Sequence, residues 1–220
     1  HHSNLVPWQA LCRAKKARLK VIPMDERGEL VLDALPGLLG PRTRLLAMTH
    51  ISNSLGTFNP VEQMTAMARE KGIPVLIDAA QSAPHYPLNV EKLSCDFLVF
   101  SGHKLFGPTG IGVLYGRREH LREMTPYQYG GEMIRSVTFE QTTYAESPQK
   151  FEAGTPHIAG AIGLGAAVKY VESLGREVIR NHLEDLERYA AEQLSLVDGL
   201  RLIGNAAHKT AILSFVMEKV

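Results

Sequence analysis

Short apolar segments alternate with amphipathic helical segments through the first half of the chain, and this alternation constrains the fold more than any other feature. Four apolar segments have the length of a buried strand, at residues 43–49, 74–78, 96–101 and 111–115. Between the first two, a helix is predicted over residues 60–71, because Pro60 stands at its start and Gly72 at its end. Continuous apolar strands of this kind need a sheet covered on both faces. The sequence therefore predicts a three-layer, mainly parallel α/β fold.

The second half of the chain has a different pattern. Residues 119–149 are rich in Gly, Tyr and Thr and are expected to form loops. Two long helices and two short strands are predicted after them, at residues 158–174, 176–196, 200–203 and 211–216. We expect a large domain over residues 1–157, followed by connecting helices and the start of a smaller α+β domain over residues 158–220. Because the chain starts without Met and stops abruptly, we expect it to be an internal piece of a longer polypeptide, truncated in both domains.

The charge balance excludes some classes of partner. Lys and Arg number 24 and Asp and Glu number 23, so the net charge of +1 gives no electrostatic footprint for nucleic acid or an anionic membrane surface. The longest apolar runs are shorter than the roughly 18 residues of a membrane span, and no signal peptide is visible. Two cysteines rule out a disulfide scaffold. We therefore expect a cytoplasmic globular protein.

Polar residues follow each apolar segment of the first half. They fall into four clusters, at residues 49–53, 78–82, 101–104 and 107–112. In open α/β sheets, ligands bind at the carboxyl ends of the strands. We therefore expect all four clusters to face one rim of the sheet, where they would form a binding site.

An acid and a lysine stand at this rim. Taken alone, Asp78 could be a helix cap and Lys104 a surface lysine. Together they place a carboxylate and an amine at the ends of neighbouring strands, with Ser101, His103 and Gln81 beside them as hydrogen-bond donors. A lysine that acts as a nucleophile needs a pKa far below its usual value of about 10.4, which burial or a cationic neighbour can provide. This combination indicates a catalytic site.

Other readings of the chemically active residues are weaker. The spacing of His50, His85 and His103 fits no compact metal-binding motif, so no metal is expected. The glycines at 107–112 precede a strand, whereas those of a dinucleotide-binding loop follow one. Cys12 falls on a predicted helix and Cys95 just before a buried strand, so we expect both to be packing residues.

Several motifs in this order resemble the class V aminotransferase family of fold-type I pyridoxal 5'-phosphate enzymes, and more narrowly its SUF-type cysteine desulfurases and selenocysteine lyases. The resemblance covers essentially all 220 residues. Its motifs are HHSNLVPW at residues 1–8, HISNSLGT at 50–57, DAAQ at 78–81, SGHK at 101–104, GPTG at 107–110 and FEAGTP at 151–156. The opening His pair is also typical of a tag remnant, but the residues that follow it favour a native segment.

The resemblance implies a pyridoxal 5'-phosphate site at the rim, within the large domain of a transferase of this fold. Lys104 would form the Schiff base with the cofactor. Asp78 would hold the protonated pyridine nitrogen and so keep the ring an electron sink. His1 would stack on the face of the ring, and Gln81 would hydrogen-bond its phenolic oxygen.

The remaining roles concern the phosphate group and the substrate. Ser101 and His103 would donate hydrogen bonds to the phosphate, a dianion that needs several fixed donors. Thr155 would reach the phosphate of the neighbouring subunit in a homodimer. Asn53 would lie near the amino-acid end of the substrate. Of these residues, the resemblance gives Lys104 and His1 catalytic roles.

The implied reaction converts L-cysteine to L-alanine and leaves a persulfide on the enzyme as sulfur for iron–sulfur cluster assembly. L-selenocysteine is an alternative substrate, and a separate protein could accept the sulfur. In the family, the cysteine that takes the sulfur and the arginine that binds the substrate carboxylate lie in the C-terminal domain, beyond Val220. We therefore expect the 220 residues alone to be inactive.

Two other functions stay open. Another class V aminotransferase or a kynureninase-like hydrolase would share Asp78 and Lys104 and would differ beyond residue 220. A noncatalytic binding or assembly module could also have kept the fold.

Overall fold

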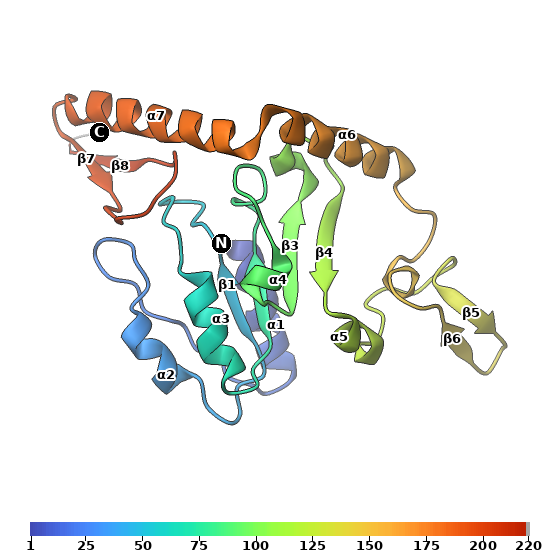
Figure 1. Cartoon of the computed structure of the whole chain (residues 1–220). Helices are drawn as coiled ribbons and strands as arrows, with labels where there is room; N and C mark the ends of the chain where they lie inside the picture. The colour runs from blue at the N-terminus through green and yellow to red at the C-terminus, as the bar shows by residue number, and fades with distance from the viewer. Residues whose placement is uncertain (219–220) are drawn as a thin grey trace.

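The computed structural model describes residues 1–218. Within them, the centre of the chain is a four-stranded sheet with strand order β1-β2-β3-β4 (Figure 1). Its strands are β1 (Leu46–Thr49), β2 (Val75–Asp78), β3 (Phe97–Ser101) and β4 (Gly112–Gly116). Strands β1, β2 and β3 are mutually parallel, and β4 runs antiparallel to β3. The predicted mainly parallel α/β fold is therefore confirmed.

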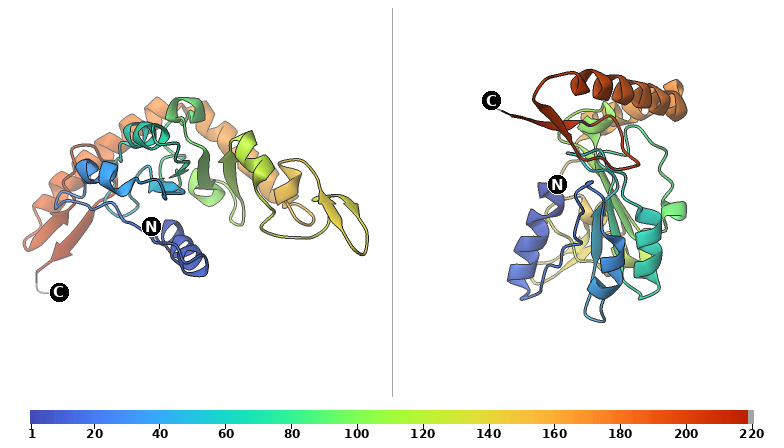
Figure 2. Two further views of the ribbon diagram at one scale, coloured as in Figure 1. Left: turned by 90° about the horizontal axis from the view of Figure 1, so that it is seen from below. Right: turned by 90° about the vertical axis from the view of Figure 1, so that its left-hand side faces the viewer.

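Helices lie on both sides of the sheet. Helix α1 (Val6–Ala14) lies on one side, and α3 (Val61–Arg69) and α4 (Val90–Leu93) lie on the other (Figure 2). Helix α3 buries Val61, Met64 and Ala68, whose i, i+3, i+7 spacing puts them on one face of the helix.

The main core fills the space between the sheet and the helices. Val75 and Ile77 of β2 and Met64 of α3 have no exposed surface, and Leu98 of β3 is 3 % exposed. The short helix α2 (Leu35–Leu38) adds Leu35, which is also fully buried. These side chains leave water together, so their packing holds the sheet and its covering helices as one unit.

Asp96 ties the strands together at the end where β3 begins. Its Oδ2 accepts a hydrogen bond from the Val75 N–H at 2.8 Å, and its Oδ1 lies 2.9 Å from His120 Nε2. The Arg117 guanidinium is 3.5 Å from the same carboxylate and donates to the carbonyls of Ser94 and Cys95. These contacts involve only the end of the sheet where β3 begins, so they do not occupy the opposite end, where the parallel strands finish.

Two long helices pass over the carboxyl ends of the parallel strands (Figure 1). They are α6 (Ile158–Leu174) and α7 (Arg176–Ser195), and the hairpin of β7 (Leu200–Ile203) and β8 (Ser214–Met217) follows them. Leu164 and Val171 of α6 pack against Leu105, in the turn after β3. The expected division into domains at residues 157 and 158 stays a prediction, and residues 219 and 220 of the second domain lie outside the described part.

The region predicted to be loops contains regular structure. Helix α5 (Arg118–Glu123) precedes an antiparallel hairpin of β5 (Ile134–Val137) and β6 (Thr142–Tyr144), and the short 3-10 helix η4 (Gln149–Phe151) follows. All residues of β5 are exposed. The hairpin has no buried face, so its sequence lacks the apolar alternation from which a strand is predicted.

The remaining short elements are 3-10 helices: η1 (His2–Asn4), η2 (Leu32–Ala34) and η3 (Gly102–Leu105). Among the described helices, none combines the length and apolar character that crossing a membrane requires.

We predict that Val75→Ala lowers the free energy of unfolding by about 2 kcal/mol or more, because it removes two buried methyl groups and leaves a cavity. The matched control is Val178→Ala on α7, where the side chain is 65 % exposed, and its effect should stay within about 0.5 kcal/mol. Urea unfolding monitored by circular dichroism measures both. Equal effects of the two substitutions would contradict the assignment of the core.

Candidate active site

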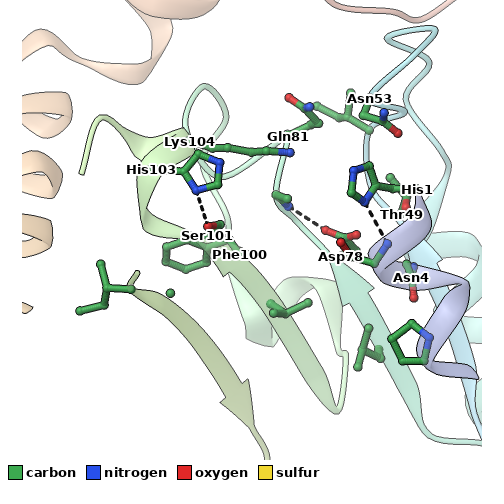
Figure 3. Close-up of a pocket in the computed structure, with 18 of the residues that line it drawn as sticks. His1, Asn4, Thr49, Asn53, Asp78, Gln81, Phe100, Ser101, His103 and Lys104 are labelled. Carbon is green, nitrogen blue, oxygen red and sulfur yellow. Dashed lines mark hydrogen bonds between the residues drawn. The ribbon is translucent and has the colours of Figure 1, made fainter. Parts of the chain in front are cut away.

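A cavity of about 770 Å³ opens at the carboxyl ends of the parallel strands. Residues of α1 and its preceding turn line one side of it, and residues that follow β1, β2 and β3 line the rest (Figure 3). The segment before β4 also reaches the cavity, because the antiparallel β4 starts where β3 ends. The four polar clusters of the sequence therefore meet at one rim.

Asp78 forms the polar part of the cavity floor. It is the last residue of the central strand β2, and it pairs with Thr49 of β1 and Val99 of β3. The side chain is 8 % exposed, and its Oδ1 accepts a hydrogen bond from the Ala80 N–H at 3.0 Å. Among the described residues, no Lys, Arg or His nitrogen lies within ion-pair distance of it. A buried carboxylate without a cation is costly, so the cavity favours a cationic ligand group beside Asp78.

Lys104 is in η3, the turn that directly follows β3, and its half-buried side chain lines the cavity. Glycines make this tight turn feasible. A Cβ atom at Gly107 would lie 2.9 Å from the Gly102 carbonyl oxygen, and one at Gly102 would lie 2.9 Å from Ile111. The Gly107 N–H donates to the same Gly102 carbonyl at 3.0 Å. Close packing of the main chain thus fixes the position from which Lys104 extends.

Ser101 and His103 lie beside Lys104 at the cavity wall (Figure 3). The Ser101 hydroxyl and His103 Nδ1 are 2.8 Å apart and share a hydrogen bond. His103 is exposed, and Ser101 is the last residue of β3. A hydroxyl and an imidazole at the end of a strand are suitable donors for an anionic group.

The opposite wall is built by the N-terminal segment. His1 lines the cavity, and its Nδ1 accepts a hydrogen bond from the Ser3 N–H at 3.1 Å. Asn4 and Trp8 also line it, and Trp8 Nε1 donates to Asn4 Oδ1 at 2.8 Å. No role was predicted for these two residues from the sequence, although both belong to the HHSNLVPW motif at residues 1–8.

Gln81 and Asn53 complete the predicted set at the rim (Figure 3). Gln81 is in the turn after β2, and Asn53 is exposed in the loop after β1. The structure brings every predicted site residue to this cavity except Thr155, which is exposed before α6 and does not line it. The roles of all these residues stay predictions.

A half-buried histidine lies behind the rim. His50 Nδ1 is 3.0 Å from the Ser82 hydroxyl, which also donates to the Ala79 carbonyl at 3.3 Å. Burial lowers the pKa of His50, and the nearby Glu62 opposes this effect. Burial and then the charge of Arg176 lower the pKa of His85. Across residues 1–218, no three His, Cys, Asp or Glu side chains are grouped as metal ligands would be.

Comparison with known proteins assigns this arrangement to a family. Residues 1–220 match the aminotransferase class-V family over their whole length. The chain belongs to this family. A cysteine desulfurase of Klebsiella pneumoniae is 53 % identical over 213 residues, which are 96 % of this chain and 52 % of the relative. A cysteine desulfurase of Synechococcus elongatus is 50 % identical over 218 residues, which are 99 % of this chain and 35 % of the relative.

Solved structures of the family give the same result. A crystal structure of the cysteine desulfurase CsdA from Escherichia coli superposes with a TM-score of 0.95 at 37 % identity, covering 100 % of this chain and 55 % of the other. The apo cysteine desulfurase from Thermococcus onnurineus superposes with a TM-score of 0.93 at 38 % identity, with the same coverage. The chain thus spans about half the length of most of these family members, and between a third and a half of the Synechococcus relative.

We predict that acidification destabilises this fold through two half-buried histidines, His50 and His85. The folded pKa values of His50 and His85 lie below the unfolded value of about 6.5, so the unfolded state binds protons first. The stability they contribute is complete above pH 6.5 and is lost as the pH falls below it, by up to about 1.4 kcal/mol per pH unit for each histidine.

Urea unfolding at pH 7.5 and pH 5.5 measures this loss. His50→Gln keeps a hydrogen-bonding side chain but cannot titrate in this range, so its stability should fall less between the two pH values than that of the parent chain. His182→Gln, at an exposed position on α7, is the control. An identical loss in the parent and in His50→Gln would disprove the contribution of His50.

Proposed function

We propose that this chain is the cofactor-binding part of a pyridoxal 5'-phosphate-dependent cysteine desulfurase that acts on L-cysteine in the cytoplasm. One observation carries the proposal: the buried carboxylate of Asp78, without a cation among the described residues, faces the same cavity as the amine of Lys104. The family membership of the chain and its similarity to cysteine desulfurases support the same activity.

The donor set of the cavity fits the cofactor group by group. The Asp78 carboxylate could form an ion pair with a protonated pyridine nitrogen, and the Lys104 amine could react with an aldehyde carbon. The Ser101 and His103 pair suits a phosphate, and the ring of His1 suits the face of a heteroaromatic ring. Gln81 offers an amide donor to the phenolic oxygen. The cavity volume of about 770 Å³ leaves room for an amino acid substrate beside the cofactor.

When bound, pyridoxal 5'-phosphate supplies an electron sink for the carbanion formed at the substrate Cα. Asp78 would stabilise a protonated pyridine nitrogen, because a carboxylate within a buried site stabilises an adjacent cation. Lys104 would have two tasks: its Nζ would be the covalent attachment point of the cofactor, and the same amine would be the base for the Cα proton of the substrate. Asn53, at the rim, would orient the amino-acid end of the substrate.

The sulfur acceptor is not provided by the cysteines of this chain. Cys95 is fully buried, and burial raises the pKa of its thiol, which disfavours the nucleophilic thiolate. Cys12 lies on α1 and does not line the cavity. We therefore place the cysteine that receives the sulfur, and the arginine that binds the substrate carboxylate, outside these 220 residues. L-selenocysteine would enter the same cavity in the same way.

The exposed position of Thr155 supports a homodimer as the active form. Its hydroxyl does not line the cavity of its own chain, so it is free to reach the phosphate site of a second copy. A separate sulfur-acceptor protein would then collect the persulfide sulfur for iron–sulfur cluster assembly. The partners are thus small molecules and proteins, and no nucleic acid or membrane has a part in the proposal.

We predict that the protein incubated with pyridoxal 5'-phosphate gains a visible absorption band, and that borohydride reduction followed by peptide mass mapping places the adduct on Lys104. Lys104→Ala should abolish the specific adduct. The matched control Lys169→Ala, at an exposed position of α6, should leave it unchanged. An adduct distributed over surface lysines, or retained in Lys104→Ala, would remove the cofactor proposal.

We also predict that Asp78→Ala weakens cofactor binding by about tenfold or more, because a close charge pair in a buried site is worth more than 1.4 kcal/mol. Spectroscopic titration with pyridoxal 5'-phosphate measures the dissociation constant. Asp185→Ala on the exposed surface of α7 is the control for charge and size. An unchanged affinity in Asp78→Ala would refute the role of Asp78.

The product formed by the natural polypeptide that contains this chain separates the desulfurase from the other two readings. Release of alanine from L-cysteine, absent in Lys104→Ala, supports the desulfurase. Amino-group transfer to a keto acid, or hydrolysis of a kynurenine-like substrate, would assign another class V activity. Cofactor binding without turnover of any amino acid would indicate a noncatalytic member.

A further inference from the structure

The turn after β2 holds Gln81 at the cavity rim and is stabilised by short hydrogen bonds within itself. The Ala83 N–H donates to the Ala79 carbonyl at 2.8 Å, and the Tyr86 N–H donates to the Ser82 carbonyl at 2.9 Å. Among the described residues, no main-chain N–H donates to the carbonyls of Ala83 and Tyr86. The carbonyl oxygens of Ala83 and Tyr86 therefore need hydrogen-bond donors from outside the turn.

Arg176, the first residue of α7, occupies both acceptors. Its Nη1 donates to the Ala83 carbonyl at 2.7 Å and to the Tyr86 carbonyl at 3.2 Å. The side chain is half-buried, and no carboxylate within the described residues forms an ion pair with it. Hydrogen bonds from a charged donor are stronger than neutral ones, so this guanidinium fastens the turn to a helix about 90 residues further along the chain.

A second contact holds the end of the turn. The Tyr86 hydroxyl donates to Thr210 Oγ1 at 2.9 Å, and Thr210 is only 5 % exposed. The Thr210 N–H donates to the Gly56 carbonyl at 3.0 Å. The ring of Phe58 meets that of Tyr86 edge to face, with centroids 4.7 Å apart. Thr210 therefore joins the turn with Gln81 to the loop with Asn53, which includes Gly56.

We propose that Arg176 and Thr210 are positioning residues for the cavity rim. Both residues belong to the C-terminal half of the chain and hydrogen-bond to the turn of residues 79–86. These bonds thereby determine the position of the Gln81 amide. The inference rests on the proposed function in one respect, the contact of Gln81 with the phenolic oxygen of pyridoxal 5'-phosphate. Neither residue touches the cofactor or substrate, because neither lines the cavity.

The first test is the pH titration of the visible band of the natural polypeptide loaded with pyridoxal 5'-phosphate. Loss of the Gln81 amide changes the proton affinity of the chromophore, so Gln81→Ala should shift the titration midpoint. Arg176→Ala should shift it in the same direction by about half a pH unit or more. The double variant should match Gln81→Ala alone, because Arg176 acts through Gln81. Additive shifts, or no shift in Arg176→Ala, would overturn the proposal.

Matched variants separate the proposed contacts from general destabilisation. Arg188→Ala removes a charge from the exposed surface of the same helix and should leave the midpoint unchanged. Thr210→Val keeps the shape of the side chain without its acceptor oxygen, and Tyr86→Phe removes the donor. Both should shift the midpoint equally, and Thr210→Ser should restore the parental value. A shift in Thr210→Ser as large as that in Thr210→Val would exclude the hydrogen bond as the cause.

Hydrogen–deuterium exchange of the protein without cofactor tests directly whether Arg176 stabilises the turn of residues 79–86. The amides of residues 79–86 should exchange about tenfold faster in Arg176→Ala, because the turn opens more often, and at the parental rate in Arg188→Ala. Unchanged exchange in Arg176→Ala would overturn the proposal. Because this readout needs no cofactor, it stays decisive when the parent protein shows no visible band, a result that would refute the proposed function instead.

Discussion

The parallel pairing of β1, β2 and β3 is the constraint on which the rest of this structure depends. In the observed register Thr49 pairs with Asp78, and Asp78 with Val99, so the strands end at nearly the same level. Each chain segment that leaves the sheet there starts from one rim and brings its polar side chains to one cavity (Figure 3). The apolar core below keeps the register, since a slip by one residue would turn buried side chains toward the opposite face.

The electrostatics of the cavity follow from this arrangement. Asp78 is buried because it ends the central strand of the parallel set, and no Lys, Arg or His nitrogen among the described residues lies within ion-pair distance of it. The glycine-rich turn around Lys104 allows α6 to pack closely, through Leu164 against Leu105. The C-terminal half of the chain thus packs against the turn that carries Lys104. Through Arg176 and Thr210 it also contacts the turn with Gln81, and through Thr210 the loop with Asn53.

The parts of the fold that the sequence predicted are those with local signals. The strands of the sheet are short apolar runs. Helix α3 was predicted over residues 60–71 from Pro60 and Gly72, and it is observed at Val61–Arg69. The hairpin of β5 and β6 was missed because neither strand has a fully buried residue. The last strand was predicted from residue 211 but starts at Ser214, because its partner β7 ends at Ile203, which pairs with Ser214.

The fold class and most of the polar side chains that line the cavity could be predicted from the sequence, because alternating apolar segments and ordered motifs are properties of neighbouring residues. The sequence also placed Asp78 and Lys104 at the same rim, since parallel strands end together. Two features could be seen only in the folded chain: the lack of a Lys, Arg or His partner for Asp78 among residues 1–218, and the hydrogen bonds from Arg176 to the turn with Gln81. These properties depend on how segments far apart in the chain pack together, and local sequence patterns carry no information on such packing.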